Sequence, residues 1–191
     1  YSPNRMLPRL DEAQARRAIG VENERPIVTY TGHIYEGKGL QIVLNIAEAV
    51  PDALFFLVGS TRRTAIEQQA EQLSNVHVIR WQPFQNVLPY LYAANVLLIP
   101  PTSGPLMKEG DTVLPLKTYL YMAAGKPILA AATPDICEVL TDGANARLVP
   151  PDNPAAAVQA LRQLIDEPLR AAELGGKVRL DARNYTYKRR A

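Results

Sequence analysis

The sequence contains one cysteine, Cys137, among its 191 residues. A single cysteine excludes an internal disulfide framework and fits a reducing compartment, and a small buried apolar residue is its simplest interpretation. No apolar run approaches the length that crosses a membrane, and no signal peptide is visible. The chain begins at Tyr1 without an initiator Met, so we expect it to be a piece of a longer protein.

An excess of charge is also missing, because 21 Lys and Arg stand against 19 Asp and Glu. This near balance does not favour a nucleic-acid partner. The chain lacks a Walker loop and the G-x-G-x-x-G dinucleotide fingerprint. His33, His77 and Cys137 do not lie where a metal cluster could form, so we predict no bound metal. A Ser/His/Asp catalytic triad has no support beyond the presence of those residue types.

The chain does contain a regular alternation of apolar runs and helical patterns. Strands that are apolar on both faces and separated by helical segments favour a parallel sheet covered on both sides. We therefore predict an α/β fold, a Rossmann-like doubly wound parallel sheet of about six strands with helices on both faces. The expected strands are residues 27–31, 53–58, 76–80, 96–99, 127–131 and 146–149. The expected helices are residues 11–19, 40–50, 61–73, 85–94, 116–124, 134–140, 154–166 and 169–183, with Thr61 capping the third and Gly175-Gly176 interrupting or weakening the last.

A doubly wound sheet binds ligands beyond the carboxyl ends of its strands, which directs attention to the loop after the first strand. In this loop Gly32 permits close approach of a ligand to the backbone, and Lys38 places an ammonium group before the next helix. A helix N-terminus and a cation both favour an anion, and His33 could donate a hydrogen bond to a phosphate. The alternative is a plain turn with a solvated lysine and a structural histidine.

Two further loops at the same edge carry candidate binding residues. Arg62 and Arg63 follow the second strand and could meet a diphosphate, or they could form a solvated charged face. Trp81, Pro83 and Phe84 follow the third strand and could take the flat face of a base. Alternatively, Phe84 packs beneath its own loop.

Residues 110–131, GDTVLPLKTYLYMAAGKPILAA, are the most informative stretch. The tripeptide Pro-Leu-Lys leads into a short amphipathic helix that ends at a glycine and is followed by a strand. The turn into such a helix can present free backbone N–H groups and a partial positive charge, and Lys117 adds a full charge. Glu109 and Asp111 could accept protons from sugar hydroxyls, or they could be exposed carboxylates without a role. We interpret this stretch as one wall of a nucleotide-sugar site.

Together these segments resemble the C-terminal, donor-binding domain of the family 4 (group 1) glycosyltransferases, which have the two-domain GT-B architecture. YTGHIYEGKGLQIVL is similar to the first strand, glycine loop and phosphate-contacting lysine of that family. FFLVGS and VIRWQPFQNVLPYLYAANVLLIP are similar to its second to fourth strands. PLKTYLYMAAGKPILAA and TDGANARLVPPDNPAAAVQALRQLI are similar to its best-known run.

The resemblance implies a division of the chain. Residues 1–24 would be a connecting segment with a helix that leads into the domain, and residues 25–184 the Rossmann-like nucleotide-sugar-binding domain. Residues 185–191, with the ending YTYKRRA, would start a return segment toward a missing N-terminal domain.

The resemblance also implies an activity, the retaining transfer of a sugar from a UDP- or GDP-sugar to a glycan or lipid-linked acceptor, with no essential metal and no cofactor. Lys38 and Glu109 would be the catalytic groups, with Lys38 neutralising the departing diphosphate. The acceptor would bind the missing domain, the fragment alone would be inactive, and the whole protein would be cytoplasmic with a peripheral association at the inner face of the membrane. The binding residues would be Gly32, His33, Lys38, Arg62, Trp81, Pro83, Phe84, Gly110, Asp111, Thr112, Lys117 and Leu120.

The sequence departs from the family pattern at one position. The family usually has two glutamates separated by seven residues, and the second, which hydrogen-bonds the ribose, is replaced here by Leu120; the first falls near Thr112. A ribose hydroxyl without its acceptor costs roughly 1–3 kcal/mol, which weakens binding about tenfold to a hundredfold. Two alternatives therefore stay open, a glycosyltransferase-like domain that acts as a binding or structural module, and a different GT-B enzyme such as a sugar epimerase.

Overall fold

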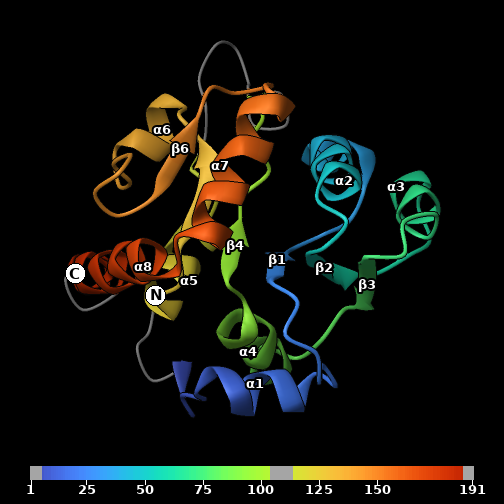
Figure 1. The fold of residues 1–191 in the computed structure, drawn as a ribbon, viewed down its shortest axis with the longest axis horizontal. Coiled ribbons are helices and arrows are strands. Elements are labelled where there is room, and N and C mark those ends of the chain that lie inside the picture. Colours follow the sequence, from blue (N-terminus) through green and yellow to red (C-terminus); the bar gives the residue numbers. More distant parts are fainter. Residues whose placement is uncertain (1–5, 104–113, 187–191) are drawn as a thin grey trace.

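The computed structural model describes residues 6–103 and 114–186. Its centre is a six-stranded sheet in the order β3-β2-β1-β4-β5-β6, and every pair of neighbouring strands is parallel (Figure 1). This order confirms the predicted doubly wound fold, with the switch in strand order between β1 and β4. The strands are β1 Ile27–Thr31, β2 Leu54–Ser60, β3 Val76–Arg80, β4 Val96–Leu98, β5 Ile128–Ala131 and β6 Arg147–Val149.

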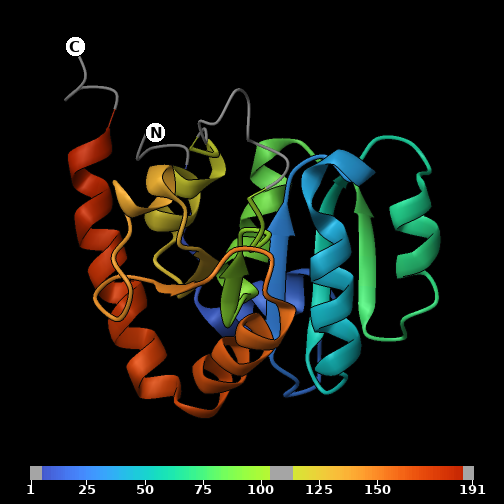
Figure 2. The ribbon, with the colours of Figure 1, turned by 90° about the horizontal axis from the view of Figure 1, so that it is seen from above.

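Helices cover both faces of this sheet, as Figure 2 shows. Successive strand residues point to opposite faces, so Ile27 belongs to one hydrophobic cluster and Val28 to the other. Helices α4 and α5 pack on the first face, and α2, α3 and α7 on the second, whereas α8 contributes side chains to both clusters. The helices are α1 Glu12–Ala18, α2 Leu40–Ala49, α3 Ala65–Ala70, α4 Phe84–Ala93, α5 Lys117–Ala124, α6 Pro134–Cys137, α7 Pro154–Asp166 and α8 Pro168–Ala182, with 3-10 turns η2 Glu36–Lys38 and η4 Arg183–Tyr185.

The segment before β1 is held against the first face. Asp11 caps α1 through a capping box with Gln14, and α1 lies against α4 (Figure 1). The buried hydroxyl of Tyr92 donates a hydrogen bond to the carbonyl oxygen of Met6 at 2.5 Å. Arg9 donates another to the carbonyl oxygen of Ala123 at 2.7 Å. Residues 6–24 are therefore anchored to both α4 and α5.

The start of α3 differs from the prediction. Thr61 was the predicted cap, but the helix begins at Ala65, and its cap is Thr64, whose hydroxyl accepts a hydrogen bond from the backbone N–H of Glu67. Arg62 therefore lies exposed in the loop before the helix instead of opening it. Thr61 and Thr64 are both good caps by residue type, and only the path of the loop decides between them.

The predicted interruption of the last helix at its glycine pair is wrong, because α8 runs without a break through Gly175 and Gly176. The helices α5 and α8 pack on each other where Gly175 passes Gly125. A Cβ atom on Gly175 would lie 2.7 Å from the carbonyl oxygen of Gly125, whereas one on Gly176 would meet nothing within 4 Å. Gly175 therefore permits a close helix contact.

None of the helices in the described ranges, 6–103 and 114–186, has both the length and the apolar character needed to cross a bilayer.

Candidate functional site

A pocket of about 420 Å³ lies at the carboxyl edge of the sheet, between the loops that follow β1 and β4. Because the strands are parallel, these loops meet at the point where the strand order reverses, which is where doubly wound sheets bind ligands. We call this hollow the switch-point pocket. Its lining residues are Tyr30, Gly32, His33, Lys38, Ile99, Pro100, Thr102, Leu114, Pro115, Leu116 and Lys117.

Two glycines bring the ends of β1 and β2 together beside this pocket. The backbone N–H of Gly32 donates to the carbonyl oxygen of Val58 at 2.8 Å. A Cβ atom on Gly59 would lie 2.5 Å from the carbonyl oxygen of Gly32. Both glycines have positive φ, 139° at Gly32 and 129° at Gly59, which other residues rarely adopt. A Cβ atom on Gly32 would lie 2.9 Å from the Nζ atom of Lys117, so this glycine leaves room for the lysine beside the turn.

Hydrogen bonds join helix α5 to the end of β1, and these bonds place the first residue of α5 at the pocket. The backbone N–H of Thr31 donates to the buried hydroxyl of Tyr121 at 2.7 Å, and the Thr31 hydroxyl lies 3.3 Å from the same oxygen. Burial raises the pKa of Tyr121 to about 12, so this hydroxyl is uncharged at neutral pH. Lys117, the first residue of α5, is thereby held beside the turn that contains Gly32.

The ammonium group of Lys117 packs on an aromatic ring. Its Nζ atom lies 3.7 Å from the centroid of the Tyr30 ring, a cation–π geometry. The Tyr30 hydroxyl donates to the carbonyl oxygen of His33 at 2.9 Å, which fixes the ring beneath the loop. Burial lowers the pKa of Lys117 to about 7, with a further contribution from the nearby charge of Lys38. Within the described part of the chain, neither lysine has a carboxylate at salt-bridge distance.

The structure brings four of the predicted site residues together in this pocket, namely Gly32, His33, Lys38 and Lys117. The side chain of His33 is exposed, and that of Lys38 is partly buried, with its Nζ 5.3 Å from the Tyr35 ring centroid. The pocket therefore has two lysine side chains and a glycine turn, a combination that suits an anion.

Five other predicted residues do not line this pocket: Arg62, Trp81, Pro83, Phe84 and Leu120. Arg62 follows β2, and the next three follow β3, which lies two strands away from β1. Trp81 is 63% exposed, and Leu120 packs against the hydrophobic core of the first face. The predicted residues Glu109, Gly110, Asp111 and Thr112 lie outside the described residues.

Tyr30 and Thr102 also line the pocket, although neither was among the predicted site residues. Tyr30 was assigned to the strand interior, although its position two residues before Gly32 at the carboxyl end of β1 is a signal that could have identified it. Thr102 follows the Pro100-Pro101 pair after β4. The sequence gives no sign that this threonine turns toward the loop after β1.

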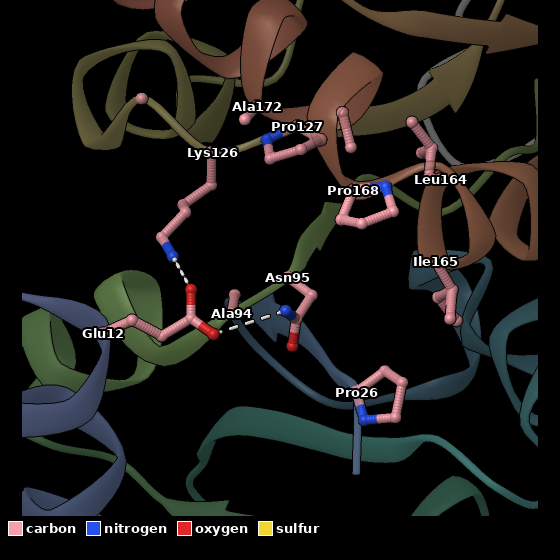
Figure 3. A pocket seen from close by; sticks show the side chains of 12 residues that line it. Glu12, Pro26, Ala94, Asn95, Lys126, Pro127, Leu164, Ile165, Pro168 and Ala172 are labelled. Carbon is pink, nitrogen blue, oxygen red and sulfur yellow. Dashed lines mark hydrogen bonds and ion pairs between the residues drawn. The ribbon is translucent and has the colours of Figure 1, made fainter. Parts of the chain in front are cut away.

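A second pocket, of about 430 Å³, lies at the opposite edge of the sheet, before β1, β4 and β5 (Figure 3). Its charged groups are already paired with each other. Lys126 forms a salt bridge with Glu12 at 2.8 Å, and the amide of Asn95 donates to the same carboxylate at 3.4 Å. These contacts tie α1 to the sheet, and they leave the switch-point pocket as the better candidate site.

The strand order, the helices on both faces and the cationic pocket at the switch point define a Rossmann-like α/β domain of the kind that binds ligands beyond its strand ends. Comparison with known families then gives the class. Residues 25–167 match the family model described as glycosyl transferases group 1, and because this match covers most of the chain, the protein belongs to that family.

Curated relatives agree with this family. The chain is 24% identical over 189 residues to a D-inositol 3-phosphate glycosyltransferase from Streptomyces avermitilis, covering 90% of this chain and 39% of the relative. It is 27% identical over 197 residues to an enzyme of the same name from Thermomonospora curvata, covering 94% of this chain and 44% of the relative. The chain thus spans about two fifths of the length of these relatives.

Solved structures agree with the fold. Sucrose-phosphate synthase from Thermosynechococcus elongatus superposes with a TM-score of 0.79 at 21% identity, covering 96% of this chain and 46% of that one. HepE from Anabaena, solved in complex with UDP-glucose, gives a TM-score of 0.78 at 18% identity, covering 95% and 50%. The C-terminal domain of a group 1 glycosyl transferase from Francisella tularensis gives 0.76 at 16% identity, covering 98% and 99%. The fold is therefore one half of a GT-B architecture, as expected.

Proposed function

We propose that this chain is the donor-binding half of a retaining glycosyltransferase, which transfers a sugar from a UDP- or GDP-sugar to a glycan or lipid-linked acceptor. The switch-point pocket holds the nucleoside diphosphate sugar, and the reaction uses no metal and no cofactor. The acceptor binds the other half of the enzyme, so this chain alone is inactive. The whole enzyme is cytoplasmic, with a peripheral association at the inner face of the membrane.

The observation that carries this proposal is that Lys38 and Lys117 line one pocket at the switch point. A diphosphate leaving group gains negative charge as the glycosidic bond breaks, and fixed cations stabilise that charge. Lys38 neutralises the leaving group. Lys117, whose pKa lies at about 7 without a ligand, becomes fully charged when an anion enters, because a nearby opposite charge favours the ammonium form.

The relatives support a nucleotide sugar as the donor, and they support the binding of donor and acceptor by different halves of the enzyme. Structures of HepE contain UDP and UDP-glucose, and its fold matches nearly all of this chain over half of its own length. An interdomain cleft would complete the site. In our proposal, Glu109 acts beside Lys38 in catalysis, and the backbone N–H groups of Gly110, Asp111 and Thr112 hold the diphosphate and the sugar.

Calorimetry with UDP and uridine tests the role of the pocket. Lys38→Ala should weaken UDP binding roughly tenfold to a hundredfold, because a charge-assisted hydrogen bond contributes about 1.5–3 kcal/mol, and it should leave uridine binding unchanged. Lys177→Ala is the matched control, since Lys177 pairs with Asp181 on α8, away from the pocket. Equal losses of UDP and uridine affinity would remove the phosphate role of Lys38.

A second candidate function is a binding or structural module whose nucleotide site has decayed. The residue that favours it is Leu120, which offers no hydrogen-bond acceptor and packs against the core. Calorimetry with UDP- and GDP-sugars distinguishes the two functions. The enzyme half binds UDP- or GDP-sugars with micromolar to millimolar affinity, whereas the module gives no heat with either.

A further inference from the structure

The side chain of Tyr30 is a rigid part of the wall of the switch-point pocket. Tyr30 lies in β1, which pairs with β2 on one side and with β4 on the other, and it is 1% exposed. Burial raises the pKa of its hydroxyl group, which therefore stays protonated at neutral pH and donates to the carbonyl oxygen of His33. The central strand and this hydrogen bond together fix the position of the ring.

The ring of Tyr30 contacts the charged end of Lys117. The Nζ atom lies 3.7 Å from the ring centroid, and the face of an aromatic ring attracts a cation. A lysine side chain is long and flexible, so on its own it does not fix where its ammonium group lies. Among the described residues, no carboxylate lies within salt-bridge distance of Nζ. The ring is therefore the contact in the described part of the chain that sets the position of this ammonium group.

Gly32 leaves the space that this contact needs. A Cβ atom on Gly32 would lie 2.9 Å from the Nζ atom of Lys117 and 3.0 Å from the hydroxyl oxygen of Tyr30. A larger residue would therefore push both side chains away from the turn. The three residues pack on one another, and the ammonium group lies against the glycine turn at the end of β1.

The ammonium group of Lys117 is open to a ligand in the pocket. Lys117 lines the pocket and is only partly buried. Its Nζ atom has no hydrogen-bond partner among the described residues, and it is nevertheless not one of their fully enclosed polar atoms, so it keeps accessible surface. A ring face, unlike a carboxylate, holds a cation without neutralising it. The charge of the protonated lysine therefore stays available to an anion.

We propose that Tyr30 is a positioning residue of the donor site, whose ring holds the ammonium group of Lys117 at the place where the diphosphate of the donor binds. The inference rests on the proposed function, because it takes the diphosphate to occupy the switch-point pocket. Tyr30 acts through Lys117, since its own hydroxyl proton is donated to His33 and the negative face of its ring does not attract an anion. The ring should therefore matter for phosphate binding only while Lys117 is present.

A double-mutant cycle tests this dependence. Tyr30→Phe keeps the ring, and replacement of Tyr30 by trifluorophenylalanine keeps nearly the same shape but withdraws electron density from the ring face, which weakens its attraction for a cation. Both changes are made with and without Lys117→Met. Calorimetry on the whole chain then gives the dissociation constants of UDP, GDP, inorganic pyrophosphate and uridine. Replacement of Phe55 by trifluorophenylalanine is the control, because Phe55 is 1% exposed in the same hydrophobic cluster as Tyr30 and lies outside the lining of the pocket.

With Lys117 present, we expect the trifluorophenylalanine variant of Tyr30 to bind nucleoside diphosphate and pyrophosphate about threefold to tenfold more weakly than Tyr30→Phe, and to bind uridine equally well. In the Lys117→Met background the two variants should differ by less than about twofold. The control should bind these ligands as wild type does.

An equal loss with and without Lys117→Met would overturn the proposal and indicate that the ring only supports the fold. Equal phosphate affinities of the two Tyr30 variants with Lys117 present would overturn it as well. If wild type binds neither UDP nor GDP, the proposed function itself fails. Binding by wild type without the dependence on Lys117 would instead overturn the role of Tyr30 alone.

Discussion

The Nζ atom of Lys117 lies 3.7 Å from the centroid of the Tyr30 ring, in a pocket that Lys38 also lines. The aromatic face favours the ammonium group, but burial and the second lysine oppose it, with the result that the pKa of Lys117 falls to about 7. Lys117 is therefore partly uncharged at neutral pH, and the anion binding that we propose should depend on pH.

The first prediction concerns proton uptake on binding. At pH 8 the empty pocket holds a mostly neutral Lys117, and UDP should restore the ammonium form, so binding should take up close to one proton per site. Calorimetry at pH 8 in two buffers with different ionisation enthalpies measures this uptake, and Lys117→Met should abolish it. Identical binding enthalpies for wild type in both buffers would contradict the prediction.

The same lysine makes stability depend on pH. The unfolded chain binds more protons than the folded chain between about pH 7 and the ordinary lysine value of 10.5, so the contribution of Lys117 to stability rises with pH across this window. Lys117→Met should flatten that rise in the free energy of unfolding. Urea titrations at pH 7 and pH 9.5 measure the free energy of unfolding. If it rises equally between these pH values in wild type and variant, the lowered pKa of Lys117 is contradicted.

A matched pair of substitutions tests the contact between α5 and α8. Gly175→Ala should destabilise the fold by about 1–3 kcal/mol, because the new Cβ atom would lie 2.7 Å from the carbonyl oxygen of Gly125. Gly176→Ala should stabilise it by about 0.5–1 kcal/mol, because that position is helical and open. Urea unfolding measures both changes in the free energy of unfolding. Changes of the same sign in the two variants would mean that the helices do not pack as closely as described.

Leu120→Glu tests where the ribose lies. Leu120 is one turn along α5 from Lys117, on the same side of the helix. A carboxylate there should accept hydrogen bonds from the ribose and tighten UDP binding about tenfold, at some cost in stability from lost core packing. Affinity for UDP and for inorganic pyrophosphate should be compared, since pyrophosphate has no ribose. No gain for UDP would rule out this placement.

Hydrogen bonds from Thr102 and Ser103 to the carboxylate of Asp152 join the loop after β4 to the loop after β6. These hydrogen bonds should weaken at low pH. Hydrogen bonds from Ser103 and Thr102 lower the pKa of Asp152, so its contribution to stability is present above the ordinary value of 3.8 and is lost as the pH falls through the lowered value. Asp152→Asn tolerates the positive φ of 59°, and it should cost up to about 1 kcal/mol at pH 7. The difference from wild type should vanish near pH 2, and a constant difference in urea unfolding would exclude the carboxylate as its cause.

Much of the fold could be predicted because it depends on local patterns. Ile27–Thr31, Val76–Arg80 and Pro154–Asp166 were predicted with the bounds that the structure has. Apolar runs of strand length and helical spacing determine such elements within a few residues. The parallel sheet followed from strands that are apolar on both faces. The turn at Gly32 and the two lysines of the site were also identifiable, because glycine and lysine between a strand end and a helix start are typical of anion-binding loops in α/β domains.

The sequence by itself therefore determined the α/β class, the strands and the edge of the sheet at which we propose that a ligand binds. Only the tertiary structure decided that Lys117 packs on Tyr30 and that Arg62 and Trp81 lie outside the pocket. It also decided that Gly175 extends a helix instead of breaking it. The physical reason is that these properties depend on residues far apart in the chain. Burial, a lowered pKa and a close helix crossing exist only where distant segments meet, whereas a strand or helix pattern is complete within about ten residues.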